Sequence, residues 1–356
     1  METRKIVRAA AVQAASPNYD LASGVEKTIA LARQARDEGC DLIVFGETWL
    51  PGYPFHVWLG APAWSMKYSA RYFANSLELG SKEYHLIAEA ARKLGIFIAL
   101  GYSERSGGSL YLGQCLISDQ GEMLWSRRKL KPTHVERTVF GEGHGRDLIV
   151  TDTPLGRVGA LCCWEHLSPL SKYALYSQQE AIHIAAWPSF SLYSEQAHAL
   201  SAKVNMAASQ IYSVEGQCFT IAASSVVTQE TLDMLEVGEH NASLLKVGGG
   251  SSMIFGPDGR TLAPYLPQDA EGLVIADLNM EEIAYAKAIN DPSGHYSKPD
   301  ATRMILDLGH REPMTIVRSG SKPGQENLDL KGAASEHQPG AERVQDTDKL
   351  VLPELS

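Results

Sequence analysis

Short apolar runs alternate along the chain with stretches of helical periodicity, and no other feature of the sequence limits the fold as strongly. The run CDLIVFGE, residues 40–47, is continuous, which is typical of a strand buried on both faces of a sheet. Before it, residues 5–14 are strand-like, and apolar residues then recur at helical spacing until Gly39. Because the second half repeats this scheme, we predict a mixed α/β fold with sheets inside and helices outside.

Predicted hairpins interrupt the alternation, so the winding is not purely parallel. They turn at residues 119–121, 154–156 and 257–259, where Gly, Asp or Pro residues gather between apolar runs. The run GLVIADLN, residues 272–279, is expected to close the sheet. A long apolar stripe at helical spacing predicts one further helix, through Ala197, Leu200, Val204, Ala207, Ile211 and Val214.

The composition changes at about Ser319. Residues 319–356 contain no Phe, Trp or Tyr and are rich in Gly, Gln, Glu, Asp and Lys. Such a segment cannot bury enough apolar area to offset its ordering entropy. We therefore expect one catalytic domain over residues 1–318 and a polar, disordered tail over residues 319–356.

Charge and cysteine content argue against several classes of protein. The formal net charge is −10, so no basic field favours a nucleic-acid or anionic membrane partner. No apolar run approaches the roughly 18 residues of a membrane span. Five cysteines fit no disulfide framework in a chain of this size, which favours a reducing cytoplasm. Because neither HExxH nor CxxC occurs, we expect no metal, and the thiol chemistry inferred below requires no cofactor.

Two buried-looking strands end in reactive groups. Glu47 ends the run at residues 40–47, where a carboxylate is costly unless it has a partner or a task. The segment ALCCWE likewise ends in two cysteines and a carboxylate. Inert packing is the usual role of a buried cysteine, but strand ends are also where α/β proteins build their sites.

The basic run RRKLK, residues 127–131, supplies a third group. On a strand Lys129 points opposite to Arg128, so the lysine can turn inward while the arginines stay solvated. A carboxylate, an ammonium and a thiol from separate strands would make a thiol hydrolase. Glu47 would accept the thiol proton, and Lys129 would stabilise developing negative charge.

Three segments resemble the signature blocks of the nitrilase superfamily. They are FGETWLPGYP, RRKLKPTHVERTVFGEG and CCWEHLSPL, and DPSGHYSKPD follows at residues 291–300. Glu, Lys and Cys stand in the family order, with spacings of 129 − 47 = 82 and 163 − 129 = 34 residues. The resemblance covers roughly residues 5–310. It implies an α-β-β-α sandwich, with Cys163 as nucleophile, Cys162 as a packing residue and Glu136 as an additional active-site glutamate.

The sequence that follows Cys163 resembles that of true nitrilases, and the sequence as a whole resembles bacterial arylacetonitrilases most. This likeness implies hydrolysis of a nitrile with two waters, through a thioimidate and a thioester, to a carboxylic acid and ammonia. Glu136 is expected to position water or to hold Lys129, while Glu47 and Lys129 raise the thiolate fraction of Cys163. Two alternatives stay open: an amidase or amide-releasing reaction on the same fold, and a non-catalytic scaffold. One departure from many relatives is His166, where they have Asn.

Aromatic residues crowd the same segments, and they favour an aryl substrate. They are Trp49, Tyr53, Phe55, Trp58, Trp64, Trp164, Trp187, Phe190 and Tyr193. Some are expected to be core anchors, as buried aromatic residues commonly are. We predict that Tyr53, Trp164 and Trp187 bind the ring of an arylacetonitrile, whose CH₂ spacer lets the ring swing away from the sulfur. The family resemblance also implies homodimers that extend into spiral homo-oligomers.

Overall fold

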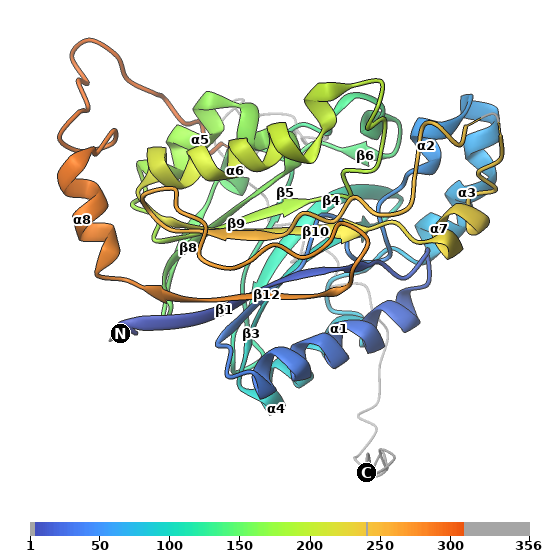
Figure 1. Ribbon diagram of the computed structural model, residues 1–356, viewed down its shortest axis with the longest axis horizontal. Coiled ribbons are helices and arrows are strands. Elements are labelled where there is room, and N and C mark those ends of the chain that lie inside the picture. Colours follow the sequence, from blue (N-terminus) through green and yellow to red (C-terminus); the bar gives the residue numbers. More distant parts are fainter. Residues whose placement is uncertain (1–3, 240, 310–356) are drawn as a thin grey trace, which may run out of the picture. The chain divides into compact units, whose positions relative to one another are not determined.

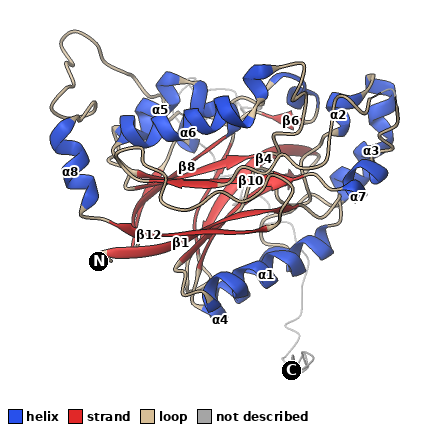
Figure 2. Cartoon of the chain, viewed as in Figure 1, coloured by secondary structure: helices blue, strands red, loops and turns tan. Residues whose placement is uncertain are grey.

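The computed structural model describes residues 4–239 and 241–309, in which twelve strands form one mixed sheet (Figures 1 and 2). The strands are β1 (Ile6–Ala15), β2 (Leu42–Val44), β3 (Phe97–Ser106), β4 (Ser109–Ile117), β5 (Met123–Arg128), β6 (Phe140–Gly141), β7 (Val150–Thr153), β8 (Gly156–Cys162), β9 (Ile182–Trp187), β10 (Phe219–Val226), β11 (Met253–Phe255) and β12 (Gly272–Asn279). The predicted hairpins at residues 119–121 and 154–156 are confirmed as β4–β5 and β7–β8.

The strand order brings several carboxyl ends to one edge of the sheet. The main path is β5-β4-β3-β2-β1-β10-β9-β8-β7, and β6, β11 and β12 pair off it with β4, β10 and β1. Strands β3, β2, β1, β10, β9 and β8 are parallel along this path. Strand β5 is two antiparallel steps from β3 and therefore runs in the same direction again. Residues that follow β2, β5 and β8 consequently meet at the same edge.

Helices cover both outer faces of the sheet (Figure 1). They are α1 (Leu21–Asp37), α2 (His56–Leu59), α3 (Pro62–Ala74), α4 (Lys82–Leu94), α5 (Pro169–Tyr176), α6 (Ala202–Gly216), α7 (Gln229–Met234) and α8 (Glu282–Ile289), with 3-10 turns η1 (His134–Thr138), η2 (Gly145–Asp147), η3 (Cys163–Leu167) and η4 (His198–Leu200). Helices α1 and α4 lie on one side, and α5 and α6 lie on the other. Gly95, at φ +64°, ends α4 in the left-handed conformation that glycine adopts most readily.

Alternating side chains of the strands build separate core layers. Ala10 of β1 packs in one cluster with Ala32 of α1 and Ile87 of α4. Its neighbour Ala9 points to the opposite face, where it shares a cluster with Val158 of β8. The second layer therefore lies between the two halves of the sheet, and the expected α-β-β-α arrangement, with sheet inside and helices outside, is confirmed.

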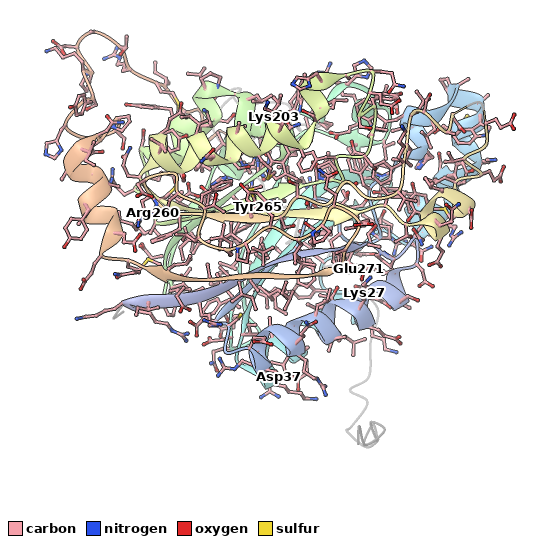
Figure 3. The ribbon with its side chains drawn as sticks, in the orientation of Figure 1. Lys27, Asp37, Lys203, Arg260, Tyr265 and Glu271 are labelled. Atoms are coloured by element: carbon pink, nitrogen blue, oxygen red, sulfur yellow. The ribbon has the colours of Figure 1, made fainter. Side chains whose placement is uncertain are left out.

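The predicted apolar stripe does not mark the buried face of α6. Ile211 is 47% exposed, and Ala207 is also exposed. The buried face instead carries polar residues such as Ser209, which accepts a hydrogen bond from Trp187 Nε1 at 2.9 Å. Because these hydroxyl groups find partners inside, polarity does not follow burial on this helix. Charged side chains, including Lys203, lie on its outer side (Figure 3).

The predicted tail, residues 319–356, lies outside the described residues, as does the end of the predicted domain from residue 310. Within residues 4–239 and 241–309, no helix is long and apolar enough to cross a membrane.

Candidate active site

The three reactive groups predicted from the sequence lie at the edge of the sheet where β2, β5 and β8 end. Glu47 lies just beyond β2, Lys129 directly follows β5, and Cys163 directly follows β8. Their exposed fractions are 1%, 0% and 8%. The Glu47 backbone N–H donates to the Trp187 carbonyl at 3.1 Å, which ties the end of β2 to the end of β9. Glycine is required at position 46 for this approach, because a Cβ there would lie 2.8 Å from the same carbonyl oxygen.

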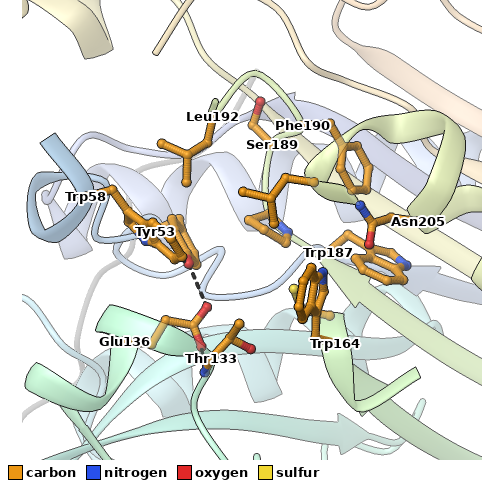
Figure 4. A pocket seen from close by; sticks show the side chains of 13 residues that line it. Tyr53, Trp58, Thr133, Glu136, Trp164, Trp187, Ser189, Phe190, Leu192 and Asn205 are labelled. Carbon is orange, nitrogen blue, oxygen red and sulfur yellow. Dashed lines mark hydrogen bonds between the residues drawn. The ribbon is translucent and has the colours of Figure 1, made fainter. Parts of the chain in front are cut away.

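Lys129 bridges two buried carboxylates. Its Nζ donates to Glu47 Oε1 and to Glu136 Oε2, each at 2.8 Å. Glu136 is held in turn by the Tyr53 hydroxyl at 2.6 Å and by the Thr133 backbone N–H at 2.6 Å (Figure 4). The second oxygen of Glu47, Oε2, is buried and has no hydrogen-bond partner among the described residues. That oxygen is therefore free to accept a proton.

The electrostatics of the site favour a protonated thiol and give Glu47 a carboxyl group that exchanges its proton close to neutral pH. Burial and, to a smaller extent, the charge of Glu136 raise the pKa of Glu47 to about 8, against the lowering effect of Lys129. Burial, followed by the charge of Glu47, also raises the pKa of Cys163 well above its ordinary value. The expectation of an enriched thiolate is thus wrong for the resting protein, because desolvation outweighs the lysine. The proton must leave the sulfur as the sulfur attacks.

Lys129 keeps its charge for the converse reason. Burial lowers its pKa, but Glu136 and Glu47 more than offset this, so the pKa stands well above the ordinary value. A permanent ammonium therefore lies beside the thiol.

Cys163 has a strained backbone. It begins η3 at φ +47°, in the left-handed region that residues other than glycine rarely adopt. Such a conformation costs about 1–3 kcal/mol and persists only where its surroundings enforce it. Two hydrogen bonds fix the turn: the Cys162 N–H donates to Glu165 Oε2 at 2.8 Å, and His166 Nδ1 lies 2.7 Å from the Cys163 carbonyl oxygen.

Glu165 also ties the thiol to the lysine strand. Its Oε1 accepts from the Leu130 N–H at 2.8 Å and from Arg127 at 2.7 Å. Arg127 is 1% exposed, so the prediction that both arginines of RRKLK stay solvated is wrong for this one. Residues 127 and 129 point to the same face of the strand, and there the Arg127 guanidinium pairs with the buried Glu165. Arg128 is partly exposed, as predicted, and pairs with Glu104.

A pocket opens beside the thiol, and most of its walls are aromatic or aliphatic (Figure 4). The lining residues are Tyr53, Trp58, Thr133, Glu136, Cys163, Trp164, Trp187, Pro188, Ser189, Phe190, Leu192, Leu200 and Asn205. Tyr53, Trp164 and Trp187, predicted to bind substrate, all lie in this wall, and Cys163 is the only one of the two adjacent cysteines to reach it.

Other aromatic residues of the same segments are structural. Trp49 packs in the core and donates to Thr28, while Trp64 packs edge-on against Tyr68. Six further residues line the pocket and were not predicted to do so: Thr133, Pro188, Ser189, Leu192, Leu200 and Asn205. A signal existed for Asn205 alone, since an Asn within an apolar helical pattern needs a local explanation.

A mixed sheet that presents a buried thiol, an ammonium and two carboxylates beside an aromatic pocket has the features of a thiol hydrolase. No group of three or more His, Cys, Asp or Glu side chains that could hold a metal occurs within residues 4–239 and 241–309.

Comparison with known proteins narrows this class. The carbon–nitrogen hydrolase family matches residues 8–288. The chain is 83% identical over 356 residues to the arylacetone-specific nitrilase of Alcaligenes faecalis, covering 100% of both chains. It is 52% identical over 301 residues to a nitrilase of Pseudomonas syringae pv. syringae, covering 85% of this chain and 90% of that one. A carbon–nitrogen hydrolase structure from Helicobacter pylori has the same fold, with a TM-score of 0.64, 18% identity and coverage of 80% and 93%. The chain belongs to the nitrilase branch of the carbon–nitrogen hydrolase family.

Proposed function

We propose that this protein hydrolyses arylacetonitriles to the carboxylic acid and ammonia, with Cys163 as nucleophile, Glu47 as base, Lys129 as stabilising cation and Glu136 as an additional active-site residue. The observation that carries the proposal is the buried bridge of Lys129 between two carboxylates beside a thiol that lines a pocket. A non-catalytic scaffold has no use for this set, because each buried charge is costly to keep.

The first half of the reaction forms a thioimidate. The sulfur of Cys163 attacks the nitrile carbon while its proton passes to Glu47, whose Oε2 has an open acceptor position. The C≡N triple bond becomes a double bond, and Lys129 stabilises the electron pair that moves onto the nitrogen. That pair then takes up the proton that Glu47 accepted from the thiol. Because its pKa is raised to about 8, Glu47 can both take up and return a proton close to neutral pH.

The second half consumes two waters. The first water adds to the thioimidate carbon, and the C–N bond breaks to release ammonia and leave a thioester. The second water cleaves the C–S bond, which gives the acid and restores the thiol. Glu47 carries protons in each step. Glu136 holds the ammonium group of the Lys129 side chain in place through a 2.8 Å hydrogen bond.

The pocket supports an aryl substrate. Trp164, Trp187 and Phe190 provide ring surfaces beside the thiol, and an aromatic pair adds about 0.5–1.5 kcal/mol beyond area burial. The relative from Alcaligenes faecalis is named an arylacetone-specific nitrilase, which favours the same class. A CH₂ spacer would let the substrate ring turn onto this wall while the nitrile carbon reaches the sulfur.

We therefore expect kcat/KM for phenylacetonitrile to exceed the values for benzonitrile and for a short aliphatic nitrile. Trp58→Leu should reduce this preference, because Trp58 lines the pocket and donates to the Tyr53 hydroxyl. Trp64→Leu is the matched control, since this half-buried tryptophan lies nearby but outside the pocket wall. A ratio below one against either competitor would overturn the substrate assignment and leave the nitrilase chemistry standing.

We further propose a cytoplasmic homo-oligomer, built from dimers, with a dispensable tail. All five cysteines are free and buried, which suits a reducing compartment. Leu167, Leu170 and Ile211 are 44%, 68% and 47% exposed on η3, α5 and α6, and they offer an apolar surface to a second copy.

Deletion of residues 319–356 is expected to leave the enzyme folded and active, because that segment has no aromatic residue with which to join a core. Light scattering of the full-length and truncated proteins measures the assembly size of each. Loss of all soluble truncated protein would contradict the proposal of a dispensable tail.

Leu170→Glu should lower the assembly size, because it places a charge on the exposed apolar surface. A monomeric wild-type protein would contradict the proposed homo-oligomer.

A further inference from the structure

A chain of buried side chains runs from the Cys163 carbonyl oxygen through His166 and His183 to Glu180. His166 Nδ1 lies 2.7 Å from the Cys163 carbonyl oxygen, His166 Nε2 lies 2.9 Å from His183 Nε2, and His183 Nδ1 lies 2.9 Å from Glu180 Oε1. His166, His183 and Glu180, which we call the histidine chain, are 1%, 0% and 2% exposed. None of them has a task in the reaction described above.

The surroundings fit this chain closely. The Tyr212 hydroxyl donates to Glu180 Oε2 at 2.6 Å, and the Tyr212 ring stacks on His183 at 3.6 Å between centroids. Residue 159 must be glycine, since a Cβ there would lie 2.3 Å from Glu180 Oε1. A buried carboxyl group is thus provided with its own space and partners.

The directions of the hydrogen bonds fix the number of protons in the chain. A carbonyl oxygen only accepts, so His166 donates from Nδ1 and, when neutral, accepts at Nε2. His183 then donates from Nε2 and accepts at Nδ1, which obliges Glu180 to donate as a neutral acid. Moving that proton onto His183 gives an imidazolium and a carboxylate, with the same total. In both arrangements the histidine chain carries one proton more than it would with two neutral imidazoles and an ionised Glu180.

We propose that His183 and Glu180 are positioning residues for the nucleophile, acting through His166, and that the extra proton they hold keeps a donor on the Cys163 carbonyl. The proposal rests on the assignment of Cys163 as nucleophile. Its physical basis is the left-handed backbone of Cys163, at φ +47°, which needs a fixed partner to hold the thiol at the pocket wall.

Loss of the extra proton breaks one link of the chain. An ionised Glu180 attracts the remaining proton of His183 to Nδ1, and His183 Nε2 must then accept from His166 Nε2. A neutral His166 with its proton on Nε2 turns a lone pair toward the Cys163 carbonyl oxygen, and that hydrogen bond is lost. Turnover should therefore fall on the alkaline side as Glu180 ionises.

The burial of the chain sets the pH range. Burial raises the pKa of Glu180 to about 8, although the hydrogen bonds from Tyr212 and the Gly159 backbone lower it in part. Burial also holds the pKa values of His166 and His183 well below the ordinary value, so within the histidine chain Glu180 is the member that titrates above pH 7. The other titratable groups that act on the chain are Arg127 of β5, Glu165 of η3, Tyr176 of α5, Tyr212 of α6 and Cys218 before β10.

Glu180→Gln separates positioning by the proton from mere packing. The amide donates permanently to His183 Nδ1, accepts from Tyr212 and does not titrate, so it imitates the protonated acid. We expect kcat at pH 7 within about twofold of wild type, and the component of the alkaline decline near pH 8 should be absent. Glu180→Leu fills similar space without a donor, and should lower kcat on the order of 10- to 100-fold with little change in KM.

Stability gives a second readout with a definite sign. Between the ordinary carboxyl value of 4.5 and about 8, the folded chain holds a proton on Glu180 that the unfolded chain has released. The free energy of unfolding of wild type should thus fall, relative to Glu180→Gln, as pH rises through this window, and the difference should level off above it. Glu215→Gln is the matched control on α6, with a carboxylate that is 40% exposed, and should keep the wild-type profiles.

An alkaline decline that persists unchanged in Glu180→Gln, or a Glu180→Leu enzyme with wild-type kcat, would overturn the proposal. Failure of the proposed function looks different, since wild type would then not hydrolyse nitriles and Cys163→Ala would change nothing. In that event the histidine tautomers still decide, because ¹⁵N NMR at pH 7 should find His166 protonated at Nδ1. A proton on His166 Nε2 alone would contradict the chain in either case.

Discussion

Cys163→Ala is expected to lower kcat by about 10⁴-fold or more while the protein stays folded, and Cys162→Ala is expected to keep most of the activity. The two sulfurs are adjacent in sequence, but only Cys163 lines the pocket, and Cys162 is fully buried at the end of β8. Removal of the Cys163 sulfur deletes the atom that forms the covalent intermediate. The alanine at 162 leaves the backbone N–H that bonds Glu165 untouched.

The measurement is steady-state turnover of phenylacetonitrile, with thermal unfolding to check the fold of both variants. Cys162→Ala also serves as the matched control, because it removes the same atoms one residue away. A dead 162 variant beside an active 163 variant would reverse the assignment, and iodoacetamide labelling that substrate blocks should map to Cys163.

Glu47→Gln and Lys129→Arg are each expected to lower kcat by about 10³-fold. The glutamine keeps the shape of Glu47 but removes the proton acceptor. The arginine keeps the charge of Lys129, yet its broad planar fork cannot replace a compact ammonium held 2.8 Å from two carboxylates with 0% exposure. Both variants should therefore bind substrate and fail in the chemical step.

The chain offers a matched pair of controls two residues farther along. Lys131 pairs with Glu142 at the surface, where the side chains are 59% and 52% exposed. Lys131→Arg and Glu142→Gln make the same chemical changes outside the site, and both should retain wild-type rates. Near-normal kcat in Glu47→Gln or Lys129→Arg would reject the mechanism.

Much of the fold was predictable because burial and strand periodicity coincide in this chain. The continuous run that ends in Glu47 contains the fully buried strand β2, and the alternation in RRKLK correctly turned Lys129 inward. The same rule also turns Arg127 inward, but its partner Glu165 comes from another strand end. Sequence periodicity states which face a residue occupies and cannot state which distant group meets it there.

The histidine chain likewise depends on contacts between distant segments, which sequence periodicity does not predict. His183 interrupts the apolar strand β9, which was a visible signal, but its links to His166 and Glu180 depend on how β8 and β9 pair. The buried face of α6 could not be predicted for a related reason, because its polar residues form hydrogen bonds with partners on other elements.

Ammonia released per nitrile consumed tests the central claim most directly. Wild-type enzyme should release one ammonia and one carboxylic acid for each phenylacetonitrile that disappears, because the thioimidate loses its nitrogen before the C–S bond is cleaved. Consumption of nitrile with an accumulating amide and no matching ammonia would contradict the account, since the intermediate would then be released before the C–N bond breaks.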